Sequence, residues 1–343
     1  MEEPVEKPKR YAKIFRGVGW AAILASLLLL AVVAFCFTDG RDALAAVSVF
    51  PIWIWAIAGI AAAAIAIPLL RSRWPVAVIV LWAMAALIGS DERRSVFRSL
   101  TGGALKEERS EKTPEGRISL RIVTLNCGER SIDAVRELGR FQPDIVFLQE
   151  APGASELAAF SKELYGESGS VAGAWHCAIV ARGKLTPRRT ALYQHGRGAL
   201  LELDDGTKIE LMSMHLAHAT TRWDLWRRSC WKQHRDVHRE RRAQLKELLD
   251  ALVADGGDVP RIFGGDFNAP PSSNLFDTIP DTYTNAFSTE GRGLGNTFIN
   301  RFPVLRIDHI YSSGEFETVT ARAVRTRHSD HRMVVCDVLL ELP

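Results

Sequence analysis

Several features that would define a class of protein are scarce or missing in this sequence. Its 343 residues include only five cysteines, so a small scaffold held together by disulfides is excluded. Lys and Arg number 43 against 40 Asp and Glu, and this near balance argues against a uniformly basic protein that coats nucleic acid. Hydrophobic residues make up 47% of the chain, which excludes a disordered or collagen-like protein.

Common catalytic signatures are missing as well. No Gly-x-Ser-x-Gly sequence supports covalent catalysis, and no closely spaced Cys and His ligands indicate a zinc site. The glycine-rich segment Gly291–Asn296 lacks the lysine and the strand-to-helix context of a phosphate-binding loop. Cys127 and Cys336 lie in strand-like segments and are expected to be buried hydrophobic residues. A disulfide bond is the alternative that the sequence leaves open.

Charge is absent from three stretches in the first third of the chain, residues 18–37, 43–70 and 74–89. A helix needs about 20 apolar residues to cross the hydrocarbon core of a bilayer. The alternatives are a buried core helix or a cleaved signal peptide, but two further apolar runs would not follow a signal peptide. We therefore predict a membrane anchor over residues 1–90, with three transmembrane helices at about 18–37, 47–70 and 74–89.

Basic residues in the short flanking segments predict the orientation of the anchor. Five of them lie between positions 7 and 16, before the first span, whereas only Arg41 lies in the next hinge. This distribution places the N-terminus in the cytoplasm and, after three spans, the remainder of the chain outside. Three arginines between positions 93 and 98 oppose this orientation, and the remainder is cytosolic if the short third span does not cross.

The part of the chain after the anchor has the pattern of an α/β enzyme domain. Residues 91–116 are charged and contain glycine, so they are predicted to be a linker that is partly helical at best. From residue 117 to 343, short β-rich segments alternate with a few helices, which favours two packed sheets covered by helices. Strands are predicted at 118–126, 145–149, 178–181, 199–203, 209–215, 261–264, 306–311, 318–324 and 333–341, and helices at 132–141 and 223–253.

Polar residues suited to catalysis stand where these strands end. Each alone has an ordinary explanation: a solvated glutamate, a satisfied histidine, or a turn in the sequence Gly-Asp-Phe-Asn. Together they form an ordered set of oxygen ligands and histidines at junctions where a rigid sheet presents functional groups. The set consists of Asn126, Glu150, His215, Asp266, Asn268, Asp308, Asp330 and His331.

This ordered set resembles the endonuclease/exonuclease/phosphatase superfamily of metal-dependent phosphoesterases, which includes DNase I-like nucleases, sphingomyelinases and inositol-polyphosphate phosphatases. The resemblance covers about residues 118–342 and rests on LN at 125–126, QE at 149–150, His215, GDFN at 265–268, IDHI at 307–310 and SDH at 329–331. It implies a four-layer α/β sandwich, with two packed mixed β-sheets flanked by helices, here preceded by the three-helix anchor. Membrane-anchored bacterial members share this layout, which implies a multi-pass protein of a bacterial inner or plasma membrane.

The resemblance also implies a metal site. Glu150 would be the main ligand of Mg²⁺, with Mn²⁺ as an alternative, and Asn126 would supply a second oxygen. Asp330 would be an additional carboxylate at or beside the metal. His309, in contrast, is predicted to be structural.

The remaining residues of the set would carry the reaction. By resemblance, Asp266 orients or deprotonates the attacking water, and Asn268 holds a phosphate oxygen. His331 would contact the phosphate or assist the nucleophile, while Asp308 fixes its tautomer and raises its basicity. His215 would hydrogen-bond a nonbridging oxygen and stabilise the developing charge.

One local segment is strongly basic although the domain as a whole is neutral. Residues 221–242 hold eight Arg and Lys against three acidic residues, interleaved with three tryptophans. The segment can be a solvated helix face, a contact surface for anionic lipid headgroups, or a groove for a nucleic-acid backbone. Arg241 and Gln244 are also similar to an R-x-x-Q helix that supports the fold in this superfamily.

These observations predict a membrane-anchored, Mg²⁺-dependent phosphoesterase that hydrolyses phosphodiester or phosphoanhydride bonds by in-line attack of an activated water. Tethering beside a bilayer favours a lipid-linked phosphate or a phospholipid headgroup as substrate, and the bilayer itself as a partner. A membrane-tethered nuclease acting on nucleic acid is the first alternative. A catalytically inactive membrane scaffold is the second, and the intact set of site residues argues against it.

Overall fold

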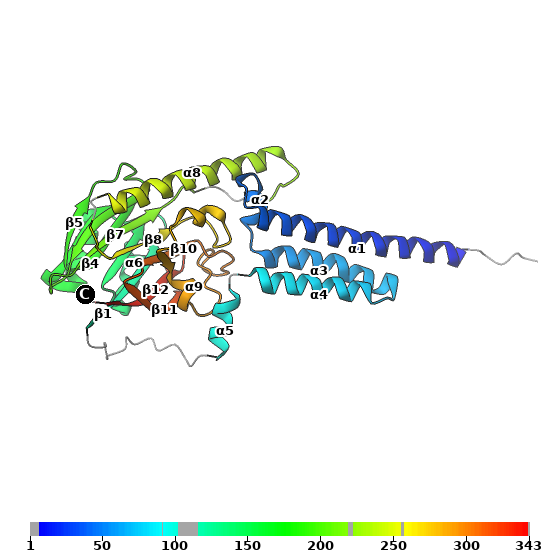
Figure 1. Ribbon diagram of the computed structural model, residues 1–343, viewed down its shortest axis with the longest axis horizontal. Helices are drawn as coiled ribbons and strands as arrows, with labels where there is room; N and C mark the ends of the chain where they lie inside the picture. The colour runs from blue at the N-terminus through cyan, green and yellow to red at the C-terminus, as the bar shows by residue number, and fades with distance from the viewer. Residues whose placement is uncertain (1–6, 91, 102–115, 219–221, 255–256, 342–343) are drawn as a thin grey trace, which may run out of the picture.

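Three long helices near the N-terminus form a bundle that projects from one end of an α/β sandwich (Figure 1). The computed structural model describes residues 7–90, 92–101, 116–218, 222–254 and 257–341. The first part consists of α1 (Lys7–Asp39), η1 (Asp42–Leu44), α2 (Ala45–Ser48), α3 (Ile52–Leu70), α4 (Trp74–Gly89) and α5 (Arg93–Thr101).

One buried set of contacts joins all three helices of the bundle, α1, α3 and α4. Trp82 of α4 is fully buried against Gly59 of α3, where an added Cβ would lie 2.0 Å from the indole ring. The indole Nε1 of Trp82 donates to Ser26 Oγ of α1 at 3.0 Å, and Ser26 Oγ donates to the Gly59 carbonyl at 2.8 Å. A small residue on α3 thus lets one large side chain join three helices.

Two helices of the bundle are long and apolar enough to cross a membrane, Tyr11–Asp39 and Ile52–Leu70. A third candidate arises only if α4 and α5, bent by 84° at their junction, are counted as one span. The predicted apolar helices are therefore present, with two or three candidate spans. The second helix begins at Ile52 and not at residue 47, because Pro51 stands at its start and residues 45–48 form the separate helix α2.

The described start of α1 and the sandwich lie at opposite ends of the bundle (Figure 1). At the end facing the sandwich, α1 finishes, α3 begins and α4 finishes. Phe37, Ile52 and Gly89 from these three helix ends share a small cavity with residues 270–272 of the sandwich. This end of the bundle is therefore packed directly on the α/β domain.

The sandwich contains two mixed sheets of six strands each. The first has the order β11-β12-β1-β2-β4-β3 and the second β5-β6-β7-β8-β10-β9. In each sheet the central pair, β1 with β2 or β7 with β8, is parallel, and all other neighbours are antiparallel. The strands are β1 (Arg117–Asn126), β2 (Ile145–Gln149), β3 (Gly169–Ala174), β4 (Cys177–Arg182), β5 (Lys184–Arg188), β6 (Gly196–Glu202), β7 (Lys208–His215), β8 (Arg261–Asp266), β9 (Tyr283–Asn285), β10 (Asp308–Ser313), β11 (Phe316–Val324) and β12 (Met333–Glu341).

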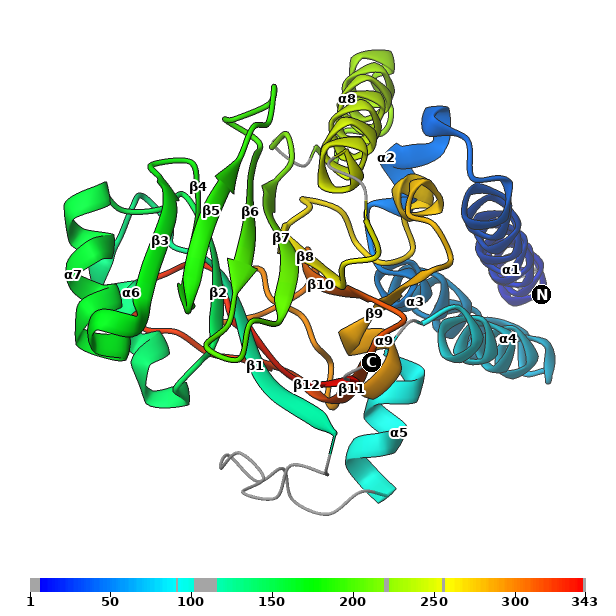
Figure 2. The same cartoon turned by 60° about the vertical axis from the view of Figure 1, so that its left-hand side comes forward.

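Helices cover the outer faces of both sheets, which makes four layers. Between the sheets, side chains such as Ile122, Phe147, Leu211 and Ile310 form one apolar core. Figure 2 shows α6 and α7 on one side of the strands and α8 on the other. These helices and the shorter ones are α6 (Ile132–Arg136), η2 (Glu137–Phe141), α7 (Ala154–Tyr165), η3 (Gly166–Ser168), α8 (Arg228–Val253), η4 (Asn274–Thr278) and α9 (Ala286–Glu290). The predicted four-layer sandwich is confirmed.

Several predicted elements differ in detail. The helix expected over 223–253 begins at Arg228, because residues 223–227 form turns closed by backbone hydrogen bonds. The segment expected to be a linker contains α5, whose Arg98 donates to the carbonyl oxygens of Phe287 and Gly291 and fixes this helix to the sandwich. Residues 91 and 102–115 of that linker lie outside the described residues, as does Thr221 of the basic segment.

Candidate active site

The central parallel pairs bring four strand ends to one edge of the sandwich. Asn126 ends β1 opposite Gln149 of β2, and His215 ends β7 opposite Asp266 of β8. Because parallel neighbours run in the same direction, the side chains that end them lie together. Glu150 follows β2 directly and joins this group.

The backbone at this edge adopts conformations that few residues tolerate. Gly265 has φ +147°, and an added Cβ would lie 1.9 Å from the carbonyl oxygen of Met214 on β7. A glycine is therefore required for β8 to approach β7 closely enough to set Asp266 beside His215. Glu150 (φ +46°) and Asn268 (φ +52°) are left-handed although neither is glycine, a conformation that concentrates at functional sites.

Asn126 connects two carboxylates from different sheets. Its Nδ2 donates to Asp266 Oδ2 at 3.1 Å and to Glu150 Oε1 at 3.4 Å, while its Oδ1 accepts from the Gly128 amide at 3.1 Å. Glu150 Oε2 accepts from the Glu129 amide at 2.9 Å. Two acidic groups and one amide thus converge, with Asn126 and Asp266 almost fully buried.

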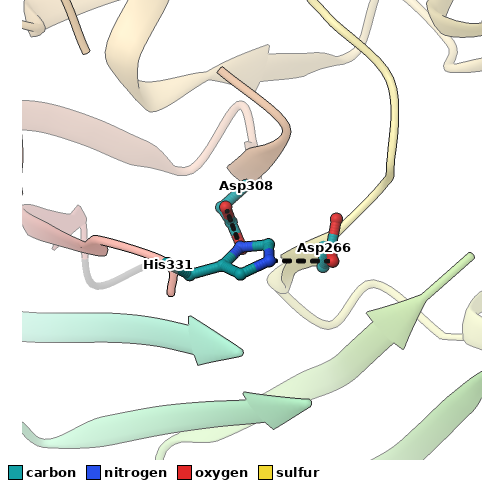
Figure 3. Close-up of side chains that lie close together, drawn as sticks. All are labelled: Asp266, Asp308 and His331. Atoms are coloured by element: carbon teal, nitrogen blue, oxygen red, sulfur yellow. Dashed lines mark hydrogen bonds and ion pairs between the residues drawn. The ribbon is translucent and has the colours of Figure 1, made fainter. Parts of the chain in front are cut away.

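His331 lies between two aspartates (Figure 3). Its Nδ1 is 2.9 Å from Asp308 Oδ2, and its Nε2 is 3.9 Å from Asp266 Oδ2. Burial by itself lowers the pKa of His331, but the charge and hydrogen bond of Asp308 outweigh this effect and raise the pKa to about 10. Asp308 thus favours the protonated form of the imidazole and holds the ring in one orientation.

Asn268 and His215 complete the surroundings of Asp266. The Asn268 amide donates to Asp266 Oδ1 at 2.8 Å, and His215 Nε2 lies 3.7 Å from Asp266 Oδ2. The Asn268 side chain donates from Nδ2 to the carbonyl oxygen of Leu216 at 3.0 Å, and its Oδ1 lies 3.3 Å from Nδ1 of His218. His218 stands only three residues after His215 and is a neighbour that the sequence analysis missed.

A cavity of about 120 Å³, which we call the catalytic cavity, is lined by seven of the eight predicted residues. Asp308 is the exception and lies behind His331. The predicted members of the lining are Asn126, Glu150, His215, Asp266, Asn268, Asp330 and His331. The same cavity is lined by Val49, which follows α2, by Val237 and Arg241 of α8, and by Phe298, Leu305 and Ile307. Nothing in the sequence indicated that Val49 would be here.

Arg241 and Gln244 hold the chain that follows β7. Arg241 Nε donates to the carbonyl oxygen of Ala217 at 2.8 Å, and Gln244 Oε1 accepts from the amide of the same residue at 2.8 Å. Burial lowers the pKa of Arg241 to about 10, which still leaves the guanidinium charged at neutral pH. The helix expected to support the fold therefore also brings a cation to the catalytic cavity.

His309 is buried away from the cavity. Its Nε2 lies 3.1 Å from the carbonyl oxygen of Ala269, and burial lowers its pKa to about 3. The five cysteines are all buried and unbonded, as predicted for Cys127 and Cys336. These groups have no direct part in the site.

The donors around the catalytic cavity fit a hard divalent cation. Glu150, Asp266 and Asp330 bring three carboxylates to its lining, and the site contains no thiolate ligand. Among the described residues, no donor bonds to the Asp330 carboxylate, and Asp308 Oδ1 is buried without a hydrogen-bond partner. Asp266, Asp308 and His331 also offer three ligand atoms that lie within 4.8 Å of one another. Oxygen-rich sets of this kind suit Mg²⁺ or Mn²⁺.

Comparison with known proteins assigns the family. The Endonuclease/Exonuclease/phosphatase family matches residues 123–331, which is more than half of the chain, and the protein belongs to this family. The predicted superfamily is thus confirmed, and with it the class of enzyme, a metal-dependent hydrolase of phosphoric ester bonds. A search of curated proteins found no match.

Solved structures share the fold of the sandwich. An endonuclease/exonuclease/phosphatase from Bacteroides vulgatus is 15% identical with a TM-score of 0.52, over 65% of this chain and 100% of that one. A family protein from Bacteroides thetaiotaomicron is 16% identical with a TM-score of 0.50, over 66% of this chain and 99% of that one. At these identities the likeness establishes the fold.

Proposed function

We propose that this protein is a membrane-anchored, Mg²⁺-dependent phosphoesterase that hydrolyses a phosphodiester or phosphoanhydride bond of a lipid-linked or phospholipid substrate. The observation that carries the proposal is the position of Val49. This residue follows α2, in the segment between α1 and α3, and lines the same cavity as Asp266 and His331. The catalytic cavity therefore adjoins the end of an apolar helical bundle, where a lipid headgroup would be found.

Contacts between the anchor and α8 support this arrangement. Asp42 lies 2.8 Å from Arg242, 3.4 Å from Arg239 and 3.1 Å from His238 of α8. Nearby, the ring of Phe50 is 4.0 Å from that of Trp223. The segment between α1 and α3 is thus attached to the enzyme by both charge and aromatic packing.

The basic segment before and within α8 has the composition of a membrane-surface contact. Trp226 is 82% exposed, and Trp231 packs against the apolar cluster of the anchor helices. Exposed Arg227 and Arg228 stand beside them. Tryptophan prefers the headgroup level of a bilayer and basic side chains are attracted to anionic lipid, so we assign this surface to the membrane.

The chain's own residues account for positioning and proton transfer. Asp266 accepts the proton of the attacking water and is oriented by the Asn126 side chain and the Asn268 amide. The cationic His331 is directed by Asp308 and donates from Nε2 to a phosphate oxygen, with His215 as a second donor. Water oxygen bonds to phosphorus as the bond from phosphorus to the leaving oxygen breaks. Glu150, Asn126 and Asp330 would hold Mg²⁺, which would neutralise charge on the phosphate.

A substrate panel tests the proposal. The full chain in lipid nanodiscs with Mg²⁺ is assayed on bis-p-nitrophenyl phosphate, a prenyl pyrophosphate, a phospholipid and plasmid DNA. We expect hydrolysis of the synthetic diester and of at least one lipid substrate, abolished by a chelator and restored by Mg²⁺. Activity confined to DNA would reject the lipid substrate, and no activity on any of the four would reject the function.

A membrane-tethered nuclease is the second candidate, favoured by the eight basic residues within 221–242. A nucleic-acid backbone bound there would be released steeply by salt, because each phosphate contact frees a counterion. The orientation of the catalytic cavity toward the anchor argues for the lipid. Cleavage of DNA with a KM that rises steeply with salt would support the nuclease instead.

A further inference from the structure

A second and larger cavity adjoins the catalytic cavity and shares Glu150 and Asp330 with it. Its volume is about 1070 Å³. Three loops line it: Gly128 and Glu129 after β1, residues 299–301 before β10, and residues 325–330 between β11 and β12. We call it the arginine groove, after Arg301, Arg325 and Arg327 in its lining.

The arginine groove is lined by both acidic and basic residues. Its acidic residues, Glu129, Glu150 and Asp330, include the two shared with the catalytic cavity. Among the described residues, no carboxylate lies within ion-pair distance of the guanidinium groups of the three arginines. His328, the remaining basic group of the lining, is paired through Nδ1 with Glu137 at 2.9 Å.

The loops that carry the arginines are fixed in place. Asn300 donates from Nδ2 to the carbonyl oxygens of Thr326 at 2.8 Å and Ser329 at 2.7 Å, which joins the two loops. Thr326 Oγ1 donates to the carbonyl oxygen of His331 at 2.6 Å, and the amide of Arg327 donates to Glu137 at 2.8 Å. The arginines therefore project from a backbone that is tied to the catalytic histidine.

Three arginines gather here, and among the described residues none of them forms an ion pair with the acidic side chains of the groove. Guanidinium groups bind phosphate through two parallel hydrogen bonds, so an open groove with three of them is suited to an anionic ligand. On the other side of the shared carboxylates, the catalytic cavity is lined by apolar Val49, Leu305 and Ile307.

We propose that the arginine groove binds a second phosphate of the substrate, beyond the phosphorus atom that is attacked. The inference rests on the proposed function and narrows its substrate class to molecules that carry at least two phosphate groups. The apolar part of such a molecule lies toward Val49 and the anchor, the attacked phosphate at Asp266 and His331, and the second phosphate at the arginines. A lipid pyrophosphate and a soluble diphosphate share this chemistry.

Kinetics with substrates that differ in one phosphate test the inference. The full chain in nanodiscs is compared with Arg301→Gln, Arg325→Gln, Arg327→Gln and the triple variant. The substrates are farnesyl pyrophosphate, ADP as a soluble diphosphate, and bis-p-nitrophenyl phosphate, which has a single phosphate. Lys208→Gln is the matched control, because it removes one positive charge at the start of β7, whose other end carries His215.

We expect the triple variant to raise the KM for a two-phosphate substrate by about tenfold or more, the loss typical of a charge-assisted hydrogen bond. Its kcat/KM for bis-p-nitrophenyl phosphate should change less than twofold, which also shows that the variant is folded. A larger effect on farnesyl pyrophosphate than on ADP identifies the lipid as the source of the two phosphates, and the reverse identifies the soluble molecule.

Three outcomes overturn the inference. The first is an unchanged KM for both two-phosphate substrates, and the second is an equal loss on all substrates. The third is an increase in KM confined to a DNA oligonucleotide added to the panel. If the wild-type protein does not hydrolyse bis-p-nitrophenyl phosphate at all, the proposed function has failed and not the groove alone.

Discussion

Arg242 of α8 lies 2.8 Å from Asp42, a residue of the segment between the first two long helices of the apolar bundle. Arg239 and His238 contact the same carboxylate, so one acidic side chain beside the bundle contacts three basic side chains of the sandwich. Because Val49 in the same segment lines the catalytic cavity, this contact sets how the cavity faces the bundle.

Removal of this contact should affect lipid substrates alone. A partly exposed ion-pair network contributes about 1 kcal/mol, so Asp42→Ala should lower hydrolysis of a lipid substrate in nanodiscs by about fivefold. Turnover of soluble bis-p-nitrophenyl phosphate should stay unchanged, since the catalytic residues are untouched. Asp39→Ala is the matched control, because Asp39 pairs with Arg41 and not with α8. An equal loss on both substrates would contradict the assignment.

Loss of either partner in the His331–Asp266 contact should remove most of the activity. Asp266→Ala and His331→Ala each delete a group assigned to proton transfer or phosphate binding, and such groups contribute about 10²- to 10⁴-fold. We expect kcat on bis-p-nitrophenyl phosphate to fall by about 10³-fold in each variant, with thermal unfolding still cooperative. Asp281→Asn, in an exposed loop, serves as the control. Unchanged turnover in either variant would refute the mechanism.

The choice of metal ligands can be tested by titration with Mg²⁺. If Glu150 and Asp330 hold the ion, Glu150→Gln and Asp330→Asn should raise the Mg²⁺ concentration for half-maximal activity by about tenfold or more, because each removes a charged oxygen ligand. Asp308→Asn should lower kcat without a change in that concentration, since Asp308 contacts His331. The opposite pattern would assign the ion to Asp266, Asp308 and His331, whose ligand atoms also lie close together.

Two arginines of one strand should differ sharply in their contribution to stability. Arg121 is 4% exposed and binds Asp337 through two nitrogens at 2.6 and 2.9 Å, whereas Arg117 pairs with exposed Glu317 and Glu341. Arg121→Met leaves a largely buried carboxylate unpaired and should lower the free energy of unfolding by about 3 kcal/mol. Arg117→Met should cost less than about 1 kcal/mol. Thermal unfolding of the full chain checks both, and equal shifts would contradict this account.

The catalytic residues could be predicted because they stand at strand ends, where alternation of apolar residues stops at a polar group. Asn126, His215 and Asp266 follow this rule, and the order of the motifs then pointed to the superfamily. Three of the four edge strands have weak sequence patterns, whereas β11 was predicted. β3 contains two glycines, β5 contains Pro187, and β9 has only three residues, so none has the pattern of a buried strand.

Other features depend on contacts between distant parts of the chain. The approach of Val49 to Asp266 joins residues more than 200 positions apart, and no local pattern encodes it. The arginine groove likewise forms from three loops that the sheet order brings together. The types of residue in the sequence predicted the chemistry of the site. The direction in which the catalytic cavity faces could be found only from the folded structure.

A label at Trp226 can measure how close the basic segment lies to the membrane. All five native cysteines are buried, so Trp226→Cys provides one accessible thiol for an environment-sensitive fluorophore. In nanodiscs with anionic lipid we expect blue-shifted emission and quenching by lipids brominated near the headgroup, because this position should lie at the interface. Lys208→Cys, at the start of β7, should show neither effect. Emission from Trp226→Cys that matches free dye in water, at every lipid composition, would show that the segment faces solvent, as a helix surface covered by its own arginines.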